Sequence, residues 1–328
     1  MIYRIPLLLI TTVLSAQQPT FKAQAPLVVV PVTVSDKNGN PVYGLTAADF
    51  RLLDNGQPRA FHLDSPGEYQ AGVSAVIVIQ TSGVSGSALL KVKKTGSMIN
   101  GYITGEGSDA AVITAAGKVR VVQDFTADPD AVGAAFRHLE VGAPSSGRDL
   151  DGIAKALDMF AQRDRTRRRV ILLISETRDR GSTTALADVL RRAQQENVTI
   201  WTISYSAFVT PFTTSAADWQ DEGGEWSFNL LAPITEPARF AKANIANDLA
   251  HYTGGRHLSF ARLKSLEDDL ASIGKEVHTQ YLMSFVPSAD LPAVHTIEVQ
   301  VQTHPEATVR YRPLYWTGDS NIPQREPR

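Results

Sequence analysis

The chain has 328 residues, with 32 Lys and Arg against 34 Asp and Glu, a formal charge of −2 and 43% hydrophobic residues. This composition excludes wholesale disorder and allows one large domain or two smaller ones. The nearly neutral charge, with no basic run longer than Arg167–Arg169, argues against nucleic-acid binding, and the absence of cysteine excludes thiol nucleophiles, disulfides and Cys-ligated metal sites.

The first sixteen residues have the pattern of a secretory signal peptide. Arg4 precedes the apolar run Ile5–Leu14, and Ser15 and Ala16 come before a polar segment. At 1.5 Å per residue this run is too short to cross ~30 Å of hydrocarbon. We therefore expect cleavage after residue 16, no stable membrane anchor in the mature protein, and a secreted or periplasmic location.

Residues 17–70 predict a small β region. Strand-like segments at 27–34 and 41–42 flank Asn38-Gly39, and segments at 50–53 and 58–63 flank Asn55-Gly56. Asn-Gly between such segments is a hairpin signal, because both residues tolerate positive φ. Between the two hairpins, Thr46–Asp49 has the pattern of a single capped helical turn.

Residues 71–278 predict an α/β domain. Short apolar runs rich in β-branched residues occur at 74–79, 110–114, 119–122, 170–174 and 198–203, as expected of strands buried on both faces. Helical patterns separate them at 88–103, 129–139, 150–163, 184–196, 238–252 and 266–276. This alternation indicates a doubly wound, mostly parallel, Rossmann-like sheet.

After residue 278 the pattern returns to strands, at 280–286, 296–301 and 308–311. Their alternation of polar and apolar residues predicts a sheet with one solvated face. Ribbons of two or three strands are marginal alone. We therefore expect residues 279–316 to pair with the N-terminal region in one β subdomain beside the α/β domain, followed by a polar tail at 317–328.

In a doubly wound sheet the functional crevice lies at the carboxyl ends of the strands. Here those ends are followed by Gln80-Thr81-Ser82-Gly83-Val84-Ser85 and by Ser175-Glu176-Thr177-Arg178-Asp179. With the order of the elements, these segments resemble the von Willebrand factor type A (VWA) domain. Over the whole chain, including Gly44–Phe50, Tyr252–Arg256 and Gln280–Phe285, the sequence is similar to exported VWA-related proteins of acidobacteria. The resemblance implies a protein-interaction module and no enzyme.

The resemblance also implies the position of a metal-ion-dependent adhesion site. Family members hold Mg²⁺ or Mn²⁺ through an Asp and two Ser of the first loop, a Thr of a second loop and an Asp after the fourth strand. Here Gln80 replaces the first Asp, Ser82 is kept, Ser85 comes one residue late, Arg148 replaces the Thr, and Glu176 replaces the last Asp. A neutral amide and an added cation predict a degenerate site with no cofactor, although weak Mg or Mn binding is the alternative.

Two hypotheses follow for the side chains of this site. The Arg148 guanidinium could take the place of the metal and pair with Glu176, or both side chains could point into water. We assign the partner-binding surface, called here the strand-end face, to six residues: Gln80, Ser82, Ser85, Arg148, Glu176 and Asp179.

A second candidate surface is the segment 207–237, which follows the last apolar strand and so rises from the same edge of the sheet. It carries Trp219, Trp226 and Phe228 among carboxylates. Exposed aromatic residues anchor interfaces well, so these three residues could recognise a protein or glycan partner. The alternative is that the aromatic rings pack back against neighbouring helices.

Two other functions remain open at this level. One is a metal-dependent adhesin or sensor with altered ligands. The other is a serine hydrolase using Ser82 or Ser85, because Gly83-Val84-Ser85-Gly86-Ser87 resembles the Gly-x-Ser-x-Gly nucleophile motif. The last glycine of that motif is Ser87 here, which argues against the hydrolase.

Overall fold

A computed structural model describes residues 27–66, 72–142, 147–163, 167–177, 179, 181–205, 244–287 and 294–317. Its centre is a six-stranded sheet in the order β10-β9-β8-β5-β6-β7, in which only the edge strand β7 runs antiparallel to its neighbour. The strands are β5 (Val73–Gln80), β6 (Asp109–Ala115), β7 (Val119–Thr126), β8 (Arg168–Ser175), β9 (Val198–Tyr205) and β10 (His257–Phe260). All eight residues of β5 are buried, as the continuous apolar pattern predicts.

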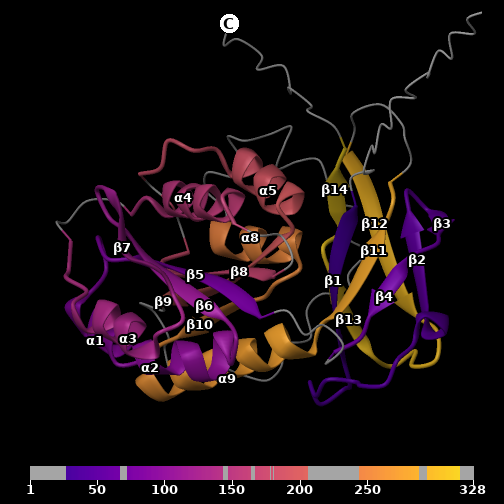
Figure 1. The fold of residues 1–328 in the computed structure, drawn as a ribbon, viewed down its shortest axis with the longest axis horizontal. Helices are drawn as coiled ribbons and strands as arrows, with labels where there is room; N and C mark the ends of the chain where they lie inside the picture. Colours follow the sequence, from indigo (N-terminus) through magenta and orange to yellow (C-terminus); the bar gives the residue numbers. More distant parts are fainter. Residues whose placement is uncertain are drawn as a thin grey trace, which may run out of the picture.

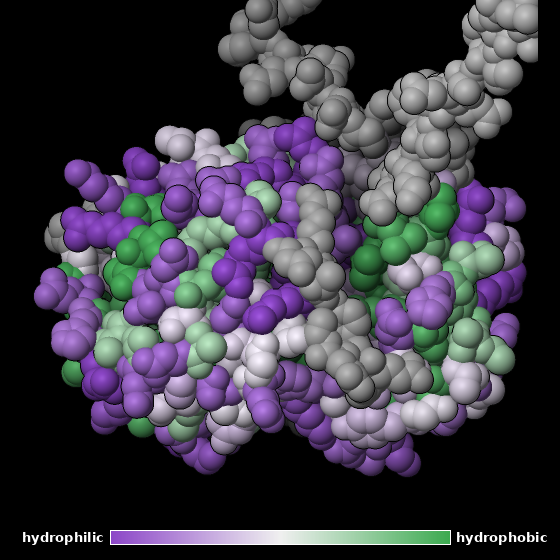
Figure 2. Space-filling model, viewed as in Figure 1, coloured by the Kyte–Doolittle hydropathy of each residue, from purple (hydrophilic) through white to green (hydrophobic). Residues whose placement is uncertain are grey.

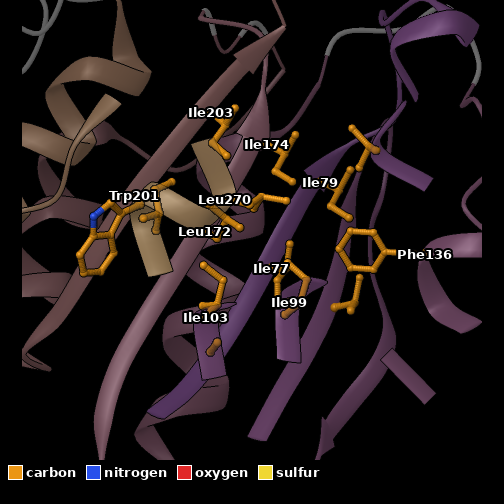
Figure 3. Packing of buried hydrophobic residues seen from close by; sticks show 14 of the residues in the cluster. Ile77, Ile79, Ile99, Ile103, Phe136, Leu172, Ile174, Trp201, Ile203 and Leu270 are labelled. Atoms are coloured by element: carbon orange, nitrogen blue, oxygen red, sulfur yellow. The ribbon is translucent and has the colours of Figure 1, made fainter. Parts of the chain in front are cut away.

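Helices cover both faces of this sheet (Figure 1). One face carries α4 (Asp149–Ala161), α5 (Leu186–Gln195) and α8 (Ile245–Thr253). The other carries α1 (Gly86–Lys93), α2 (Gly96–Met98), α3 (Pro129–Arg137), α9 (Leu263–Thr279) and the π-helix η2 (Ile99–Thr104). Alternate strand residues such as Ile77, Leu172 and Ile203 point toward this second layer, where they pack with Phe136 and Leu270 (Figure 3).

The helix predicted at 88–103 is wrong, because three short helical segments replace it. The Thr95 hydroxyl donates to the Val92 carbonyl oxygen at 2.8 Å, at the end of α1. Gly96 then lies against Phe136 of α3, and a Cβ on Gly96 would lie 2.6 Å from Phe136 Cβ. The apolar pattern of the sequence is continuous across this break and gives no sign of it. The break depends on the tight packing of Gly96 against α3.

Two four-stranded sheets stand beside the α/β domain, in the orders β13-β1-β11-β4 and β14-β12-β2-β3 (Figure 1). The strands are β1 (Val28–Ser35), β2 (Phe50–Asp54), β3 (Gln57–Arg59), β4 (His62–Asp64), β11 (Tyr281–Phe285), β12 (Val294–Val301), β13 (Thr308–Tyr311) and β14 (Leu314–Trp316). A 3₁₀ turn, η1 (Ala47–Asp49), precedes β2. Each sheet combines strands from both ends of the chain, so the predicted fold class is confirmed.

The hairpin predicted at Asn55-Gly56 is confirmed, and the one at Asn38-Gly39 is confirmed only as a short turn. Asn55 and Gly56 have φ of 50° and 75° and join β2 to β3. Around Asn38-Gly39, a bridge joins Ser35 to Pro41, and the Val42 N–H donates to the Val34 carbonyl oxygen at 2.9 Å. Strand β1 forms its longer ladders with β11 and β13, from the other end of the chain.

The expectation of one solvated face holds for β12 but not for β11. Residues of β12 alternate between buried and exposed, whereas four of the five residues of β11 are buried. One face of β11 packs with Leu52 and Val299 of the second sheet, and its other face, with Leu282, faces the α/β domain. Strand β11 is therefore covered on both sides.

The surface differs between the two parts of the molecule. From the viewpoint of Figure 1, hydrophilic side chains cover most of the α/β domain with small hydrophobic patches between them, and hydrophobic side chains gather more densely on the β subdomain (Figure 2). In the part of the chain that the structure describes, no helix combines the length and apolar character needed to cross a membrane.

Candidate functional site

The strand-end face is organised around Gln80, the last residue of β5, whose side chain is 2% exposed. Its amide nitrogen donates to the Ser82 carbonyl oxygen at 2.9 Å, and its amide oxygen accepts from the Glu176 N–H at 2.7 Å. A Cβ on Gly147 would lie 2.6 Å from Gln80 Cδ, so the glycine makes room for this side chain. The amide therefore links the ends of β5 and β8 through their backbones.

The two serines of the first loop have different environments. Ser82 is fully buried, and its Oγ has no hydrogen-bond partner among the described residues. Ser85 is exposed and caps α1, because its Oγ accepts from the Ala88 N–H at 3.2 Å. Its hydroxyl also lies 3.1 Å from Ser87 Oγ.

Asp149, the first residue of α4, is a residue of this face that the sequence reasoning missed. It is 2% exposed, and its Oδ1 has no hydrogen-bond partner among the described residues. Burial, together with the nearby charges of Asp179 and Glu176, raises the pKa of Asp149 well above its usual value, and a hydrogen bond with the Ser175 side chain opposes that change. Its position next to Arg148 was the available signal, but nothing in the sequence indicates that it is buried.

The hypothesis that Arg148 pairs with Glu176 is wrong. Arg148 Nη1 lies 3.3 Å from Asp151 Oδ2 on the first turn of the same helix, and its side chain is 38% exposed. A carboxylate three residues away on the same helix lies within easy reach of a flexible guanidinium, whereas Glu176 belongs to the loop after β8. The cation therefore stays at the rim of the face, outside the position that the resemblance gives to the metal.

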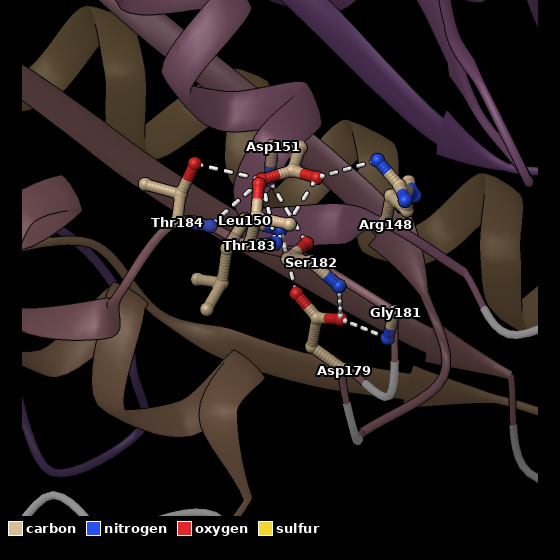
Figure 4. Close-up of polar contacts among 8 residues, drawn as sticks. All are labelled: Arg148, Leu150, Asp151, Asp179, Gly181, Ser182, Thr183 and Thr184. Atoms are coloured by element: carbon tan, nitrogen blue, oxygen red, sulfur yellow. Dashed lines mark hydrogen bonds and ion pairs between the residues drawn. The ribbon is translucent and has the colours of Figure 1, made fainter.

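Asp151 and Asp179 join the loop after β8 to the start of α4 (Figure 4). Asp151 Oδ1 accepts from the N–H groups of Thr183 and Thr184, at 3.0 and 2.9 Å, and from the Thr184 hydroxyl at 2.7 Å. Asp179 Oδ2 accepts from the Leu150 N–H at 2.9 Å. Each carboxylate therefore satisfies backbone donors of the opposite segment, and Asp179 also receives the favourable field of a helix N-terminus.

The same carboxylate of Asp179 also closes its own turn. Its Oδ1 accepts from the N–H groups of Gly181 and Ser182, each at 3.0 Å. The Ser182 hydroxyl in turn accepts from the Asp151 N–H at 3.0 Å. With all these donors satisfied, Asp179 and Asp151 hold the loop in place rather than presenting free carboxylates.

Tyr205, the last residue of β9, is a second residue that the sequence reasoning missed. Its hydroxyl donates to the Gln80 carbonyl oxygen at 3.0 Å. Burial, and then the charges of Asp149 and Glu176, raises the pKa of this phenol above its usual value. The hydroxyl therefore stays protonated and acts as a donor beside the two carboxylates.

The structure thus brings together four of the six predicted residues, Gln80, Ser82, Glu176 and Asp179, and places Ser85 and Arg148 at the rim. Trp219, Trp226 and Phe228 lie outside the described residues. Among the residues that are described, no group of three or more His, Asp or Glu side chains is arranged to hold a metal ion. Inside the face, Ser82 Oγ and Asp149 Oδ1 are buried oxygens that have no hydrogen-bond partner among the described residues.

No protein-family model and no curated protein matches the chain. Solved structures do resemble it. A von Willebrand factor type A protein from Catenulispora acidiphila is 11% identical, with 93% of this chain and 78% of that chain covered and a TM-score of 0.48. An aerotolerance-related membrane protein from Bacteroides fragilis is 13% identical (62% and 100% covered, TM-score 0.43), and BatB from Bacteroides thetaiotaomicron is 14% identical (63% and 100%, TM-score 0.41). At these identities the likeness concerns the fold alone.

Proposed function

We propose that this chain is an exported, non-enzymatic VWA-type interaction module, related to the acidobacterial proteins, which binds a protein or glycan through the strand-end face without an obligatory metal. The observation that carries the proposal is the buried amide of Gln80. Both ends of that amide are engaged with backbone groups of Ser82 and Glu176, so the side chain serves as a permanent link between two loops. A link of this kind keeps the face rigid in the absence of any ion.

The residues of this face fit a divalent cation poorly. Mg²⁺ and Mn²⁺ prefer several oxygen ligands, and carboxylates must compensate for the water that the ion gives up. Here the first ligand position holds a neutral amide whose oxygen already accepts from the Glu176 N–H. Both carboxylate oxygens of Asp179 accept hydrogen bonds from backbone N–H groups, and Arg148 adds a positive charge at the rim.

The contact surface of the module lies around this rigid centre. Ser85, Arg148 and Thr183 are partly or fully exposed there, and Val141 is 55% exposed in the loop beside Ser82. That loop is tied to the first one, because the Gly142 N–H donates to the Thr81 carbonyl oxygen at 2.8 Å. An exposed apolar side chain and a partly exposed guanidinium at the same edge of the sheet suit a partner that buries both.

The test is capture of a partner from a cell-envelope extract by the full mature chain. Arg148→Glu and Val141→Asp should each remove a specific band, whereas Lys275→Glu should keep it, because Lys275 is exposed on α9, away from this face. Loss of the Arg148 ion pair should cost at most about 1 kcal/mol, so the variant stays folded. A band set that is identical for all three variants would overturn the proposed surface.

Export is tested separately. The chain, expressed with residues 1–16 in a bacterial host, should be recovered outside the cytoplasm with a new N-terminus near Gln17, as measured by mass spectrometry of the intact protein. Recovery of the uncleaved chain from the cytoplasm would contradict export.

The serine-hydrolase alternative lacks an accessible nucleophile with a base. Ser82 is fully buried, and Ser85 Oγ caps α1 beside Ser87. No histidine among the described residues is hydrogen-bonded to either hydroxyl, whereas a catalytic serine needs such a partner. A serine-reactive phosphonate should therefore leave the mature chain unlabelled, and labelling of Ser85 would restore the alternative.

One observation favours the cation-dependent alternative. Ser82 Oγ and Asp149 Oδ1 are buried oxygens without described partners, and a bound cation is one way to satisfy buried oxygens of this kind. Calorimetry with Mn²⁺ decides this point. The metal-free module predicts no binding by the wild type at micromolar Mn²⁺, whereas binding that disappears in Asp149→Asn would establish the cation-dependent function.

A further inference from the structure

A cavity of about 240 Å³ lies between the α/β domain and the β subdomain. Its α/β wall includes the first residues of β8 and β9, and its other wall includes residues of β1 and β11 such as Pro31 and Leu282. Strand β8 runs from this cavity to the strand-end face, a length of about 23 Å at 3.3 Å per residue. The cavity is therefore separate from the proposed partner-binding surface.

The lining of this cavity is rich in positive charge. Four of its lining residues are arginines, Arg167, Arg168, Arg169 and Arg312, and one is acidic, Asp64. Arg167 and Arg169 have acidic partners elsewhere: Arg167 Nη1 lies 3.0 Å from Asp109 Oδ2, and Arg169 Nη1 lies 2.7 Å from Glu196 Oε2.

Arg312 differs from these arginines. It is 3% exposed, its Nη1 donates to the Gln194 carbonyl oxygen at 3.2 Å, and no carboxylate of the described residues lies within 4.0 Å of its guanidinium. Its Nε is buried and has no described partner. Burial lowers the pKa of Arg312 to about 10, so the group keeps its charge at neutral pH.

The helix beside Arg312 offsets only part of the cost of burying this charge. Gln194 lies in the last turn of α5, where the carbonyl groups carry a partial negative charge. That field is weaker than a full counter-charge, and a buried cation without a counter-charge is strongly unfavourable. Among the described residues, no acidic side chain supplies the rest of the counter-charge for Arg312.

The neutral groups of the cavity can also donate to an anion. Thr199 and Asn197 are among the lining residues, and Asn197 is exposed. A guanidinium together with hydroxyl and amide donors is the combination that binds tetrahedral oxyanions. The volume is sufficient for a phosphate group with bound water or with a small organic substituent.

We propose that this cavity binds a phosphate group, either as the free ion or as a small phosphomonoester, with the Arg312 guanidinium as its counter-cation. The anion completes the contact between the two parts of the molecule, because its ligands come from the starts of β8 and β9 and from the segment between β13 and β14. The site rests on Arg312 and Asn197, and so it is independent of the proposed function of the strand-end face.

Two measurements test the site on the full mature chain at constant pH and ionic strength. The Tm is compared between solutions of inorganic phosphate and of chloride, and the binding of phosphate is measured by calorimetry. The wild type should bind one phosphate and show a saturable rise in Tm. Arg312→Met keeps the aliphatic stem and removes the charge. It should lose the response to phosphate and should have a Tm at least equal to that of the wild type in chloride. A wild type that does not respond to phosphate, or an Arg312→Met variant that responds like the wild type, overturns the proposal.

Asn197→Asp gives a second test that does not depend on the buried arginine. Asn197 is exposed and has φ of 52°, a conformation that Asp also tolerates, so this variant should fold. It places a negative charge at the edge of the cavity and should weaken phosphate affinity at least about tenfold. Gln195→Glu is the control, because it adds the same charge at an exposed position that does not line the cavity and should change the affinity less than about twofold. Equal affinities for the two variants would contradict the site.

A small phosphomonoester, glycerol 3-phosphate, separates the two sources of the phosphate group. Tighter binding of the ester than of inorganic phosphate would show that the cavity takes a phosphorylated molecule, and tighter binding of the free ion would show that it takes phosphate itself. Binding of neither compound overturns the proposal.

Discussion

The amide of Gln80 makes a stability prediction that can be worked out from its two hydrogen bonds. Gln80→Leu keeps the approximate size and shape of the side chain, and so it opens little cavity space at this buried position. It removes the acceptor for the Glu176 N–H and the donor for the Ser82 carbonyl oxygen. Any loss of stability therefore reports on those two bonds.

Each backbone group left without a partner in a buried position costs about 1–3 kcal/mol. Glu176 is half-buried, so water can partly hydrate its N–H, and the lower half of that range applies to it. The sum predicts a loss of about 2–5 kcal/mol in the free energy of unfolding. At an m-value of about 3 kcal/mol per molar urea, the unfolding midpoint should fall by about 1 M.

Urea unfolding followed by far-UV circular dichroism measures this loss, because the described α-helices all belong to the α/β domain. Gln300→Leu is the matched control, since Gln300 is exposed on β12 and its side-chain amide donates only to Glu298. Its stability should change by less than about 0.5 kcal/mol. If Gln80→Leu changed stability as little as Gln300→Leu does, the amide would not be holding the ends of β5 and β8 together.

Three further predictions concern the same face. Gly147→Ala should lower the free energy of unfolding by about 1–3 kcal/mol, because the new Cβ would lie 2.6 Å from Gln80 Cδ. Gln80→Ala in the same chain should relieve part of that loss. A double-mutant cycle in urea that gives additive losses would refute the contact. Burial, and then the charge of Asp179, raises the pKa of Asp149 above 3.8, so the folded chain holds a proton that the unfolded chain releases. The stability of the wild type should therefore fall as pH rises from about 4 to the pKa of Asp149 in the folded chain. Over that pH range, the Tm of Asp149→Asn should increase relative to that of the wild type. Tm curves that stay parallel would contradict this. Asp151→Ala should lower the free energy of unfolding by about 2 kcal/mol, because backbone N–H groups of the loop after β8 lose their acceptor. The same loss should make that loop more sensitive to limited proteolysis. An unchanged cleavage rate would show that Asp151 does not hold the loop.

The meeting of Gln80 and Glu176 was predictable from the sequence. Gln80 directly follows one apolar run and Glu176 follows another after Ser175; both runs predict parallel buried strands, whose carboxyl ends lie at one edge of a sheet. The pairing of β5 with β8 confirms that reasoning. Tyr205, the last residue of β9, lies at the same edge, but a tyrosine at a strand end carries no signal of the bond that it makes to the Gln80 carbonyl oxygen.

The behaviour of the charged groups was not predictable in the same way. Arg148 has Asp149, Asp151 and Glu176 as possible partners, and the sequence does not order them. The structure pairs it with Asp151, three residues along the same helix, rather than with Glu176 of the loop after β8. For Asp149, burial depends on loops and strands that are far apart along the chain.

Local patterns in the sequence were thus sufficient to determine the alternation of strands and helices, the turn at Asn55-Gly56 and the presence of a neutral amide at the end of β5. These features depend on side-chain periodicity and backbone preferences within a few residues. Only the tertiary structure decided which strands β1 pairs with, that Asp149 is buried, and that Arg312 is buried with no acidic partner among the described residues. The physical reason is that desolvation and the choice of ionic partner are set by whatever surrounds a side chain in space, and those neighbours come from distant parts of the chain.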